Sequence, residues 1–285
     1  MNQELQAMFD NLSGKNRSNA ESLPVFDSSQ GIEVESLPKE RMKNPSDKIH
    51  ISVWGCFKTG KSSLINALLN EKILPVKTTS ATGVVTKIYY APKKTAHVVL
   101  KDGTRKAIDW DELEDYIVIR EKTIHYMKTS PVERVEIGID NVLLKEICLL
   151  DLPGDEDDPI LSEKAFEVAM RSDIVIVVMS AIKLMSEKER QNIDFFNKEL
   201  KGNLLFAVNK VDFLDHEDME DIRNYTTLIL HDKGNEIMGY GDISYCNSGK
   251  QQIGIENFRQ KLLELQENPY WILEKKLISF LINHK

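Results

Sequence analysis

The sequence contains no long apolar run, and none approaches the roughly 18 residues that a membrane-spanning helix needs. Its first ten residues, MNQELQAMFD, lack the positively charged start and the apolar stretch of a signal peptide. Without a long apolar run or a signal peptide, we expect a soluble protein of the cytoplasm. No internal repeat is visible.

Cysteine, histidine and positive charge are also scarce. The three cysteines, Cys56, Cys148 and Cys246, have no metal-ligand spacing, and the six histidines are scattered. We expect buried free thiols and no metal site built from these residues. Lys and Arg number 37 against 45 Asp and Glu, for a net charge of −8. This balance argues against a nucleic-acid surface as the main function, although a local basic patch stays open.

What the sequence does contain is a glycine-rich turn between a strand and a helix. The pattern GxxxxGK[ST] follows an alternating apolar run over 50–54 and opens a helical pattern over 61–70. Backbone N–H groups and the positive end of a helix dipole converge on an anion in such a loop. A chance glycine turn is the alternative interpretation. We predict a polyphosphate site in which Lys61 reaches the β- and γ-phosphates, Ser62 ligates Mg²⁺, and the whole loop contacts the nucleotide: Gly55, Cys56, Phe57, Lys58, Thr59, Gly60, Lys61, Ser62 and Ser63.

The segment LLFAVNKVD, residues 204–212, indicates which base is bound. A carboxylate such as that of Asp212 only accepts hydrogen bonds, and guanine offers N1–H and the N2 amine side by side. Adenine would leave that carboxylate unpaired, at a cost of several kcal/mol. Lys210 can lie over the base, and Asn209 can connect this segment to the phosphate loop. Alone, NKxD could be a polar strand end, but behind a phosphate loop it predicts guanine.

Two further motifs follow predicted strands. In ICLLDLPG, Asp151 is placed to approach the Mg²⁺ shell through water, and Gly154 to offer an N–H to the γ-phosphate. A simple turn would explain Pro153-Gly154 but not the DxxG spacing. YCNSGKQQIGIE places Ser248, Gly249 and Lys250 after a strand. A backbone N–H of this tripeptide could donate to the guanine O6.

Strand-like and helical patterns alternate along the chain, which predicts an α/β fold: a P-loop domain with a mostly parallel sheet, helices on both faces, and short helices at both termini. The stretch 91–130 is longer than a simple connection and predicts a hairpin and a helix at one sheet edge. The predicted strands are 50–54, 84–90, 97–101, 134–139, 147–151, 174–179, 204–208 and 243–246. The predicted helices are 61–70, 110–120, 162–170, 186–200, 217–231 and 254–265.

Three parts are expected: residues 1–48, 49–265 and 266–285. The first combines a short amphipathic helix over 1–12 with a flexible linker rich in Ser, Asn, Lys and Glu. The second is the predicted P-loop nucleotide-binding domain. The third is an amphipathic helix whose apolar arc covers roughly 200°. So wide a face needs burial within the protein, for which the N-terminal helix is a candidate, or contact with a membrane surface.

The four motifs, in this order, resemble the guanine-nucleotide-binding domain of GTPases, and over residues 49–265 the chain is similar to the bacterial dynamin-like group. FKTGKSSLINALLNEKILP resembles that group's phosphate loop and helix, and VERVEIGIDNVLLKEICLLDLPG its paired strands before DxPG. KTTSATGVVTKIYY is similar to its switch I. The resemblance implies that Thr82 reaches Mg²⁺ and the γ-phosphate, with Thr79 and Thr78 as alternatives. It also implies that helices flanking the domain relay its state, but the family's long helical stalk is missing, which puts self-assembly and membrane remodelling in doubt.

Two departures from this pattern bear on mechanism. Asp155 follows Gly154, so no Gln is present there to orient the attacking water. Dynamin-like enzymes also lack a Gln at this position. Lys58 stands where the family usually has Ser or Asn, a position that in dynamins helps to hold a monovalent cation. Lys58 could itself supply that positive charge, or it could simply point to solvent.

We therefore expect GTP hydrolysis assisted by Mg²⁺, with Lys61, Thr82 and Lys58 as catalytic residues, and Ser62, Thr82 and Asp151 around the metal. Dimerisation through the nucleotide face would accelerate GTP hydrolysis. Peripheral contact with a membrane is a further expectation. Two alternatives remain: a ribosome- or RNA-associated GTPase, and a switch in which nucleotide gates a partner with little turnover.

Overall fold

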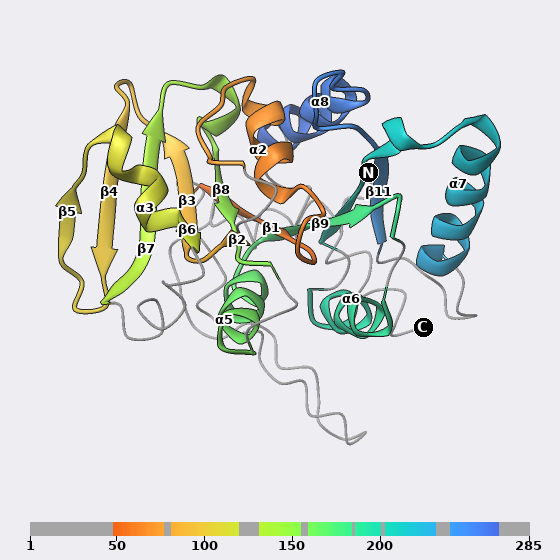
Figure 1. Cartoon of the computed structure of the whole chain (residues 1–285), viewed down its shortest axis with the longest axis horizontal. Coiled ribbons are helices and arrows are strands. Elements are labelled where there is room, and N and C mark those ends of the chain that lie inside the picture. Colours follow the sequence, from red (N-terminus) through yellow and green to blue (C-terminus); the bar gives the residue numbers. More distant parts are fainter. Residues whose placement is uncertain are drawn as a thin grey trace, which may run out of the picture. The chain divides into compact units, whose positions relative to one another are not determined.

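A computed structural model describes residues 48–76, 81–119, 131–154, 159–183, 186–200, 203–231 and 240–267. Within them lies a nine-stranded sheet with the strand order β11-β10-β9-β1-β8-β3-β7-β4-β5 (Figure 1). The strands are β1 (Ile49–Trp54), β3 (Val85–Tyr90), β4 (Thr95–Leu100), β5 (Arg105–Ala107), β7 (Val132–Ile139), β8 (Ile147–Asp151), β9 (Ile174–Ser180), β10 (Leu204–Asn209) and β11 (Tyr240–Tyr245).

The sheet is mixed but mostly parallel, as predicted. Strands β11, β10, β9, β1 and β8 run parallel, so their carboxyl ends meet at one edge. Beyond β8, the antiparallel strand β3 begins an extension in which β3 and β7 are parallel, while β4 is antiparallel to both of its neighbours. The predicted hairpin is formed by β4 and β5.

Alternation along the central strands sends their side chains into two separate cores. On β9, Ile174, Ile176 and Val178 belong to one buried cluster, and the residues between them belong to the other. Because β9 is buried on both faces, its sequence is a continuous apolar run from Ile174 to Met179.

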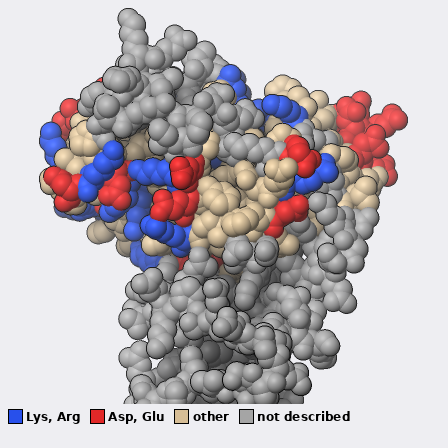
Figure 2. Space-filling model, turned by 90° about the horizontal axis from the view of Figure 1, so that it is seen from below, with Lys and Arg blue, Asp and Glu red and all other residues tan. Residues whose placement is uncertain are grey.

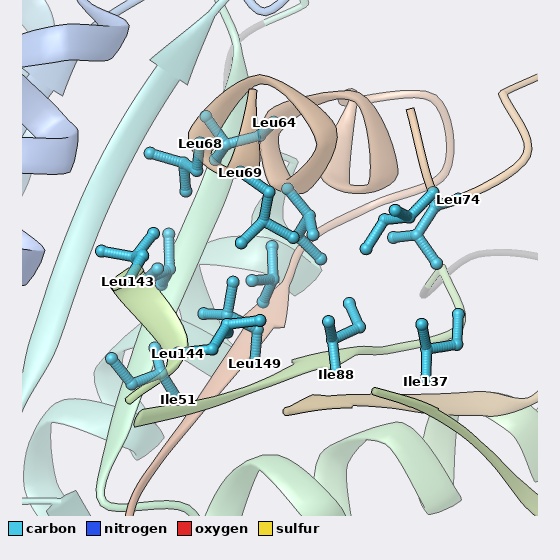
Figure 3. Close-up of a cluster of buried hydrophobic side chains, with 14 of the residues drawn as sticks. Ile51, Leu64, Leu68, Leu69, Leu74, Ile88, Ile137, Leu143, Leu144 and Leu149 are labelled. Atoms are coloured by element: carbon cyan, nitrogen blue, oxygen red, sulfur yellow. The ribbon is translucent and has the colours of Figure 1, made fainter. Parts of the chain in front are cut away.

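The first core lies beneath α2 and α8, and the second is covered by α5, α6 and α7 (Figure 1). Leu64, Leu68 and Leu69 of α2 belong to the first core, together with Ile51 and Leu149 of the sheet (Figure 3). Arg259 of α8 donates to the carbonyls of Leu68 (2.8 Å) and Ala67 (2.9 Å), which satisfies the carboxyl end of α2. The helices are α2 (Lys61–Leu69), α3 (Leu113–Ile117), α5 (Pro159–Met170), α6 (Glu187–Leu200), α7 (His216–His231) and α8 (Ile255–Glu267), with 3₁₀ turns at η3 (Trp110–Glu112), η4 (Val142–Leu144) and η5 (Val211–Phe213).

Helix α7 has a capped and acidic start. The Asp215 carboxylate accepts from the Asp218 N–H at 2.9 Å, and Glu217 and Asp218 occupy the first turn, where the helix dipole favours negative charge. Seen from below, acidic side chains gather at the end of the molecule that carries α7, whereas charges of both signs mix at the opposite end (Figure 2). The cap fixes where the chain turns after β10.

One predicted element was wrong. The helix expected over 110–120 consists of η3 followed by only one and a half turns of α3, and Val118–Ile119 forms a short strand, β6, paired with β2 (Ala81–Thr82). Two β-branched residues in succession favour extended backbone, and here a partner strand is available. The bounds of β5, the second strand of the predicted hairpin, were not among the predicted strands. The expected terminal helices, over 1–12 and in 266–285, lie outside the described residues, except that α8 extends to Glu267.

Candidate nucleotide site

The glycine-rich loop joins β1 to α2 at the carboxyl edge of the sheet. A Cβ at Gly55 would lie 2.3 Å from the carbonyl oxygen of Val178 on β9, so only glycine fits this close approach. Gly60 has φ +97°, and a Cβ there would lie 2.3 Å from Asn209 Nδ2. The loop therefore passes tightly between neighbouring strands and delivers Lys61 as the first residue of α2.

Lys61 is buried, and its amine donates to the Gly55 and Cys56 carbonyls, each at 3.0 Å. Gly154, after β8, lies close to the Lys61 amine and to the phosphate loop. A Cβ at Gly154 would be 3.2 Å from Lys61 Nζ and 3.1 Å from Phe57 Cα. The structure thus brings the DxPG glycine against the phosphate loop.

Three residues far apart in sequence converge at the start of α2. Ser62 Oγ donates to Asp151 Oδ2 at 2.7 Å. Thr82 Oγ1 lies 3.4 Å from the same carboxylate oxygen and 3.3 Å from Ser62 Oγ. These are the three residues that the sequence assigned to Mg²⁺.

The Asp151 carboxylate is fully buried, and burial raises its pKa to about 6, opposed by the Ser62 hydrogen bond and the Lys61 charge. Its second oxygen, Oδ1, is buried with no hydrogen-bond partner in the described residues. A buried carboxylate oxygen with an open lone pair, beside two hydroxyls, suits a hard cation that takes oxygen ligands. Ser62, Thr82 and Asp151 therefore fit a Mg²⁺ ion held mainly by water and phosphate oxygens.

Asn209, at the end of β10, connects the NKxD segment to the phosphate loop. Its Nδ2 donates to the Thr59 carbonyl at 2.9 Å, and its Oδ1 accepts from the Ser248 N–H at 3.0 Å. The buried Asn209 side chain therefore holds three loops together: the phosphate loop, the NKxD segment and the loop that carries Ser248.

The residues expected to meet the base lie at the same edge but face solvent. Lys210 has φ +67°, which turns the chain into the η5 turn, where Asp212 is exposed. The Val211 N–H points to the Cys246 carbonyl at 3.5 Å, so the NKxD segment lies alongside the strand end that leads to Ser248. Gly249 and Lys250 are exposed there, with the Gly249 N–H donating to Asn247 Oδ1 at 2.8 Å.

A family model described as the dynamin family matches residues 51–211, more than half of the chain. The chain belongs to the dynamin family. Its described part, from β1 to α8, forms a dynamin-like GTPase domain.

Several relatives place this domain in context. An uncharacterised protein from the xynA 3′ region of Caldicellulosiruptor sp. is 30% identical over 268 residues, which cover 90% of this chain and 63% of that protein. Dynamin-like protein 2 of Campylobacter jejuni is 24% identical over 267 residues, covering 90% and 40%. A solved structure, from work on an oligomerised bacterial dynamin pair that senses and tethers membranes, has a TM-score of 0.60 at 19% identity, covering 82% of this chain and 40% of that chain. The chain thus spans 40–63% of the length of these relatives. Among the described residues, no helix is long and apolar enough to cross a membrane.

Lys58, the departure from the dynamin-like pattern, sits at the tip of the phosphate loop. It has φ +62° and is exposed, with its amine 4.9 Å from the centre of the Phe57 ring. Thr78, Thr79 and the acidic run 155–158 lie outside the described residues.

The sequence did not reveal that β6 pairs with the segment carrying Thr82. The signal was present in the β-branched Val118-Ile119 pair, but the helical pattern before it was extended too far. Asn66 was also missed: its side chain accepts from the Ile73 and Leu74 N–H groups at 3.0 and 2.9 Å, which holds the chain as it leaves α2 toward switch I.

Proposed function

We propose that this dynamin-family domain binds GTP with Mg²⁺ and hydrolyses it to GDP and phosphate. The observation that carries the proposal is the meeting of Ser62, Thr82 and Asp151 within hydrogen-bond reach of one another, next to the buried Lys61. Each comes from a different motif, and nothing in the core packing requires two hydroxyls and a lysine around a buried carboxylate.

In this proposal the phosphates lie over the loop, where the backbone N–H groups at the start of α2 and the Lys61 amine face negative charge. Lys61 exchanges its carbonyl partners for phosphate oxygens. A bound Mg²⁺ would neutralise charge that develops on those oxygens. Thr82 and the Gly154 N–H would contact the γ-phosphate, so both groups report whether GTP or GDP is bound.

Guanine would be read by Asp212 and by the backbone near Ser248. The carboxylate accepts from guanine N1–H and N2–H, and the stem of Lys210 covers the base. Support comes from Asn209, which holds both loops at one edge. An exposed carboxylate is available to a base that arrives from solvent.

Lys58 would supply positive charge near the transferred phosphate in place of a monovalent cation. Its backbone follows Phe57, which lies against Gly154, so a change of side-chain rotamer would bring the amine from the Phe57 ring toward the phosphates. This role would compensate for the absence of a Gln after Gly154.

We further propose that a second copy docks on the nucleotide face and accelerates turnover. Three large apolar side chains are exposed on the loops at this edge: Ile182 (56%), Phe213 (69%) and Ile253 (47%). They follow β9, β10 and β11, whose carboxyl ends lie side by side at this edge of the sheet, and exposed apolar groups on one face mark interaction sites. The domain would work in the cytoplasm, with peripheral membrane contact through residues 266–285, which flotation with anionic liposomes would test.

The deciding experiment measures GTP turnover per protein molecule as the protein concentration rises. Specific activity should rise with concentration in wild type and rise less in Ile253→Ser. Leu228→Ser is the matched control, because Leu228 is even more exposed (57% against 47% for Ile253) but lies far along α7. Turnover that is negligible at all concentrations despite tight GTP binding would favour the nucleotide-gated switch, and stimulation by ribosomes would favour the ribosome-associated GTPase.

A further inference from the structure

The two short strands outside the main sheet meet at the nucleotide site. Strand β2 pairs antiparallel with β6, with Ala81 opposite Ile119 and Thr82 opposite Val118. The ladder continues for one more residue, because the Gly83 N–H donates to the Ile117 carbonyl at 2.8 Å. The backbone of the predicted switch I is therefore held on both sides of Thr82.

Strand β6 is anchored in the main core. Leu113, Ile117 and Val118 are buried and belong to the same cluster as Leu74 and Val84, which lie on either side of switch I. Strands β2 and β6 are each two residues long, and α3 leads directly into β6 from this core. The pairing therefore connects the segment that carries Thr82 to a buried part of the insertion.

Register in this pair has a chemical consequence. A slip of one residue in a strand sends every side chain to the opposite face. Here it would replace Thr82 with Ala81 or Gly83, and neither of these has a side-chain oxygen. The observed register is the one that leaves Thr82 Oγ1 3.4 Å from Asp151 Oδ2 and 3.3 Å from Ser62 Oγ.

We propose that β6 is the positioning strand of switch I, and that Val118 and Ile119 hold Thr82 in the register that hydrolysis needs. This rests on the proposed function, which it extends by giving the insertion between β3 and β7 a role. The insertion carries the chain out through β4 and β5 and returns it through α3, so that β6 arrives beside the metal ligands.

Ile119→Pro tests the role directly, because proline cannot donate a backbone hydrogen bond within the ladder. Ile119→Ala is the matched control, since it keeps the backbone N–H. A misplaced Thr82 should lower kcat for GTP by about tenfold or more in the proline variant. The GDP affinity and the KM for GTP should stay near wild type, a split that general damage to the fold would not produce. A normal kcat in a proline variant that binds GDP would overturn the proposal.

A disulfide keeps the proposal testable if the proline variant does not fold. Residues opposite each other in an antiparallel pair have Cα atoms about 4.5–5.5 Å apart, within the range that a disulfide spans. Ala81→Cys combined with Ile119→Cys should therefore form a disulfide under mild oxidation, and the two single variants control for the native buried cysteines.

The oxidised double variant should retain the kcat of its reduced form, because the paired state is the hydrolytic one. Loss of turnover on oxidation, restored by a reductant, would show that switch I must leave β6 to act and would overturn the proposal. Failure of the disulfide to form in the folded protein would overturn the register. If it forms but wild type shows no GTP turnover, the proposed function fails and the role of β6 in hydrolysis fails with it, while the pairing itself stands.

Discussion

Asn209→Ala should damage folding stability and nucleotide binding together, because one buried side chain connects three loops. Asn209 is 1% exposed and donates to the Thr59 carbonyl while accepting from the Ser248 N–H. Truncation leaves both groups without that partner, at about 1–3 kcal/mol for each group that stays buried. Since Ser248 is partly exposed and water can reach it, we expect the free energy of unfolding to fall by about 2–4 kcal/mol in total.

Urea denaturation without nucleotide would measure the stability loss, and calorimetric titration with GDP would measure affinity. GDP affinity should fall by about tenfold or more, which corresponds to about 1.4 kcal/mol, because the phosphate and base loops lose their common anchor. Asn203→Ala is the matched control. Asn203 is 2% exposed at the opposite end of the same strand region and donates to the Asp173 carbonyl at 3.0 Å. The Asn203→Ala substitution should lower the free energy of unfolding by about 1–2 kcal/mol and leave the GDP affinity unchanged. Equal effects of both variants on GDP affinity would refute the reasoning.

Three further substitutions test individual residues. Lys61→Ala should abolish nucleotide binding, because the loop loses its one buried positive charge; unchanged GTP affinity by calorimetry would disprove the phosphate-loop assignment. Thr82→Ala should lower kcat by about 100-fold and leave GDP affinity intact, whereas Thr82→Ser should retain much of the activity; if Thr79→Ala has this effect instead, the alignment of switch I is wrong. Lys58→Ser should slow turnover and make it depend on K⁺, and a wild-type enzyme already strongly stimulated by K⁺ would contradict the role given to Lys58.

The sheet and the motif positions could be predicted because each depends on local pattern. Apolar runs such as 174–179 are long enough to identify buried strands, and GxxxxGK[ST], DxPG and NKxD each follow a strand end. Parallel strands bring those ends to one edge, so Ser62, Asp151 and Asn209 could be placed together before any geometry was known.

Pairing between short segments could not be predicted in the same way. β2 and β6 have two residues each, and nothing in either segment specifies the other. The β-branched pair Val118-Ile119 favours extended backbone, but it also continues a helical apolar pattern, and the sequence does not show that the backbone of Thr82 is its partner. The left-handed backbone of Lys58, with φ +62°, was not predicted either, because it depends on how the whole loop turns between β1 and α2.

The central claim is that this domain reads guanine through Asp212, and Asp212→Asn tests it most directly. The substitution puts an NH₂ donor opposite the guanine N2 amine, so GTP affinity should fall by about 100-fold or more. Xanthine carries an oxygen at that ring position and should pair with the new amide, so XTP should replace GTP as the preferred ligand, while ATP should not gain. A competition assay with the three nucleotides gives the answer. Equal weakening of all three, or a wild type that prefers ATP, would contradict the account.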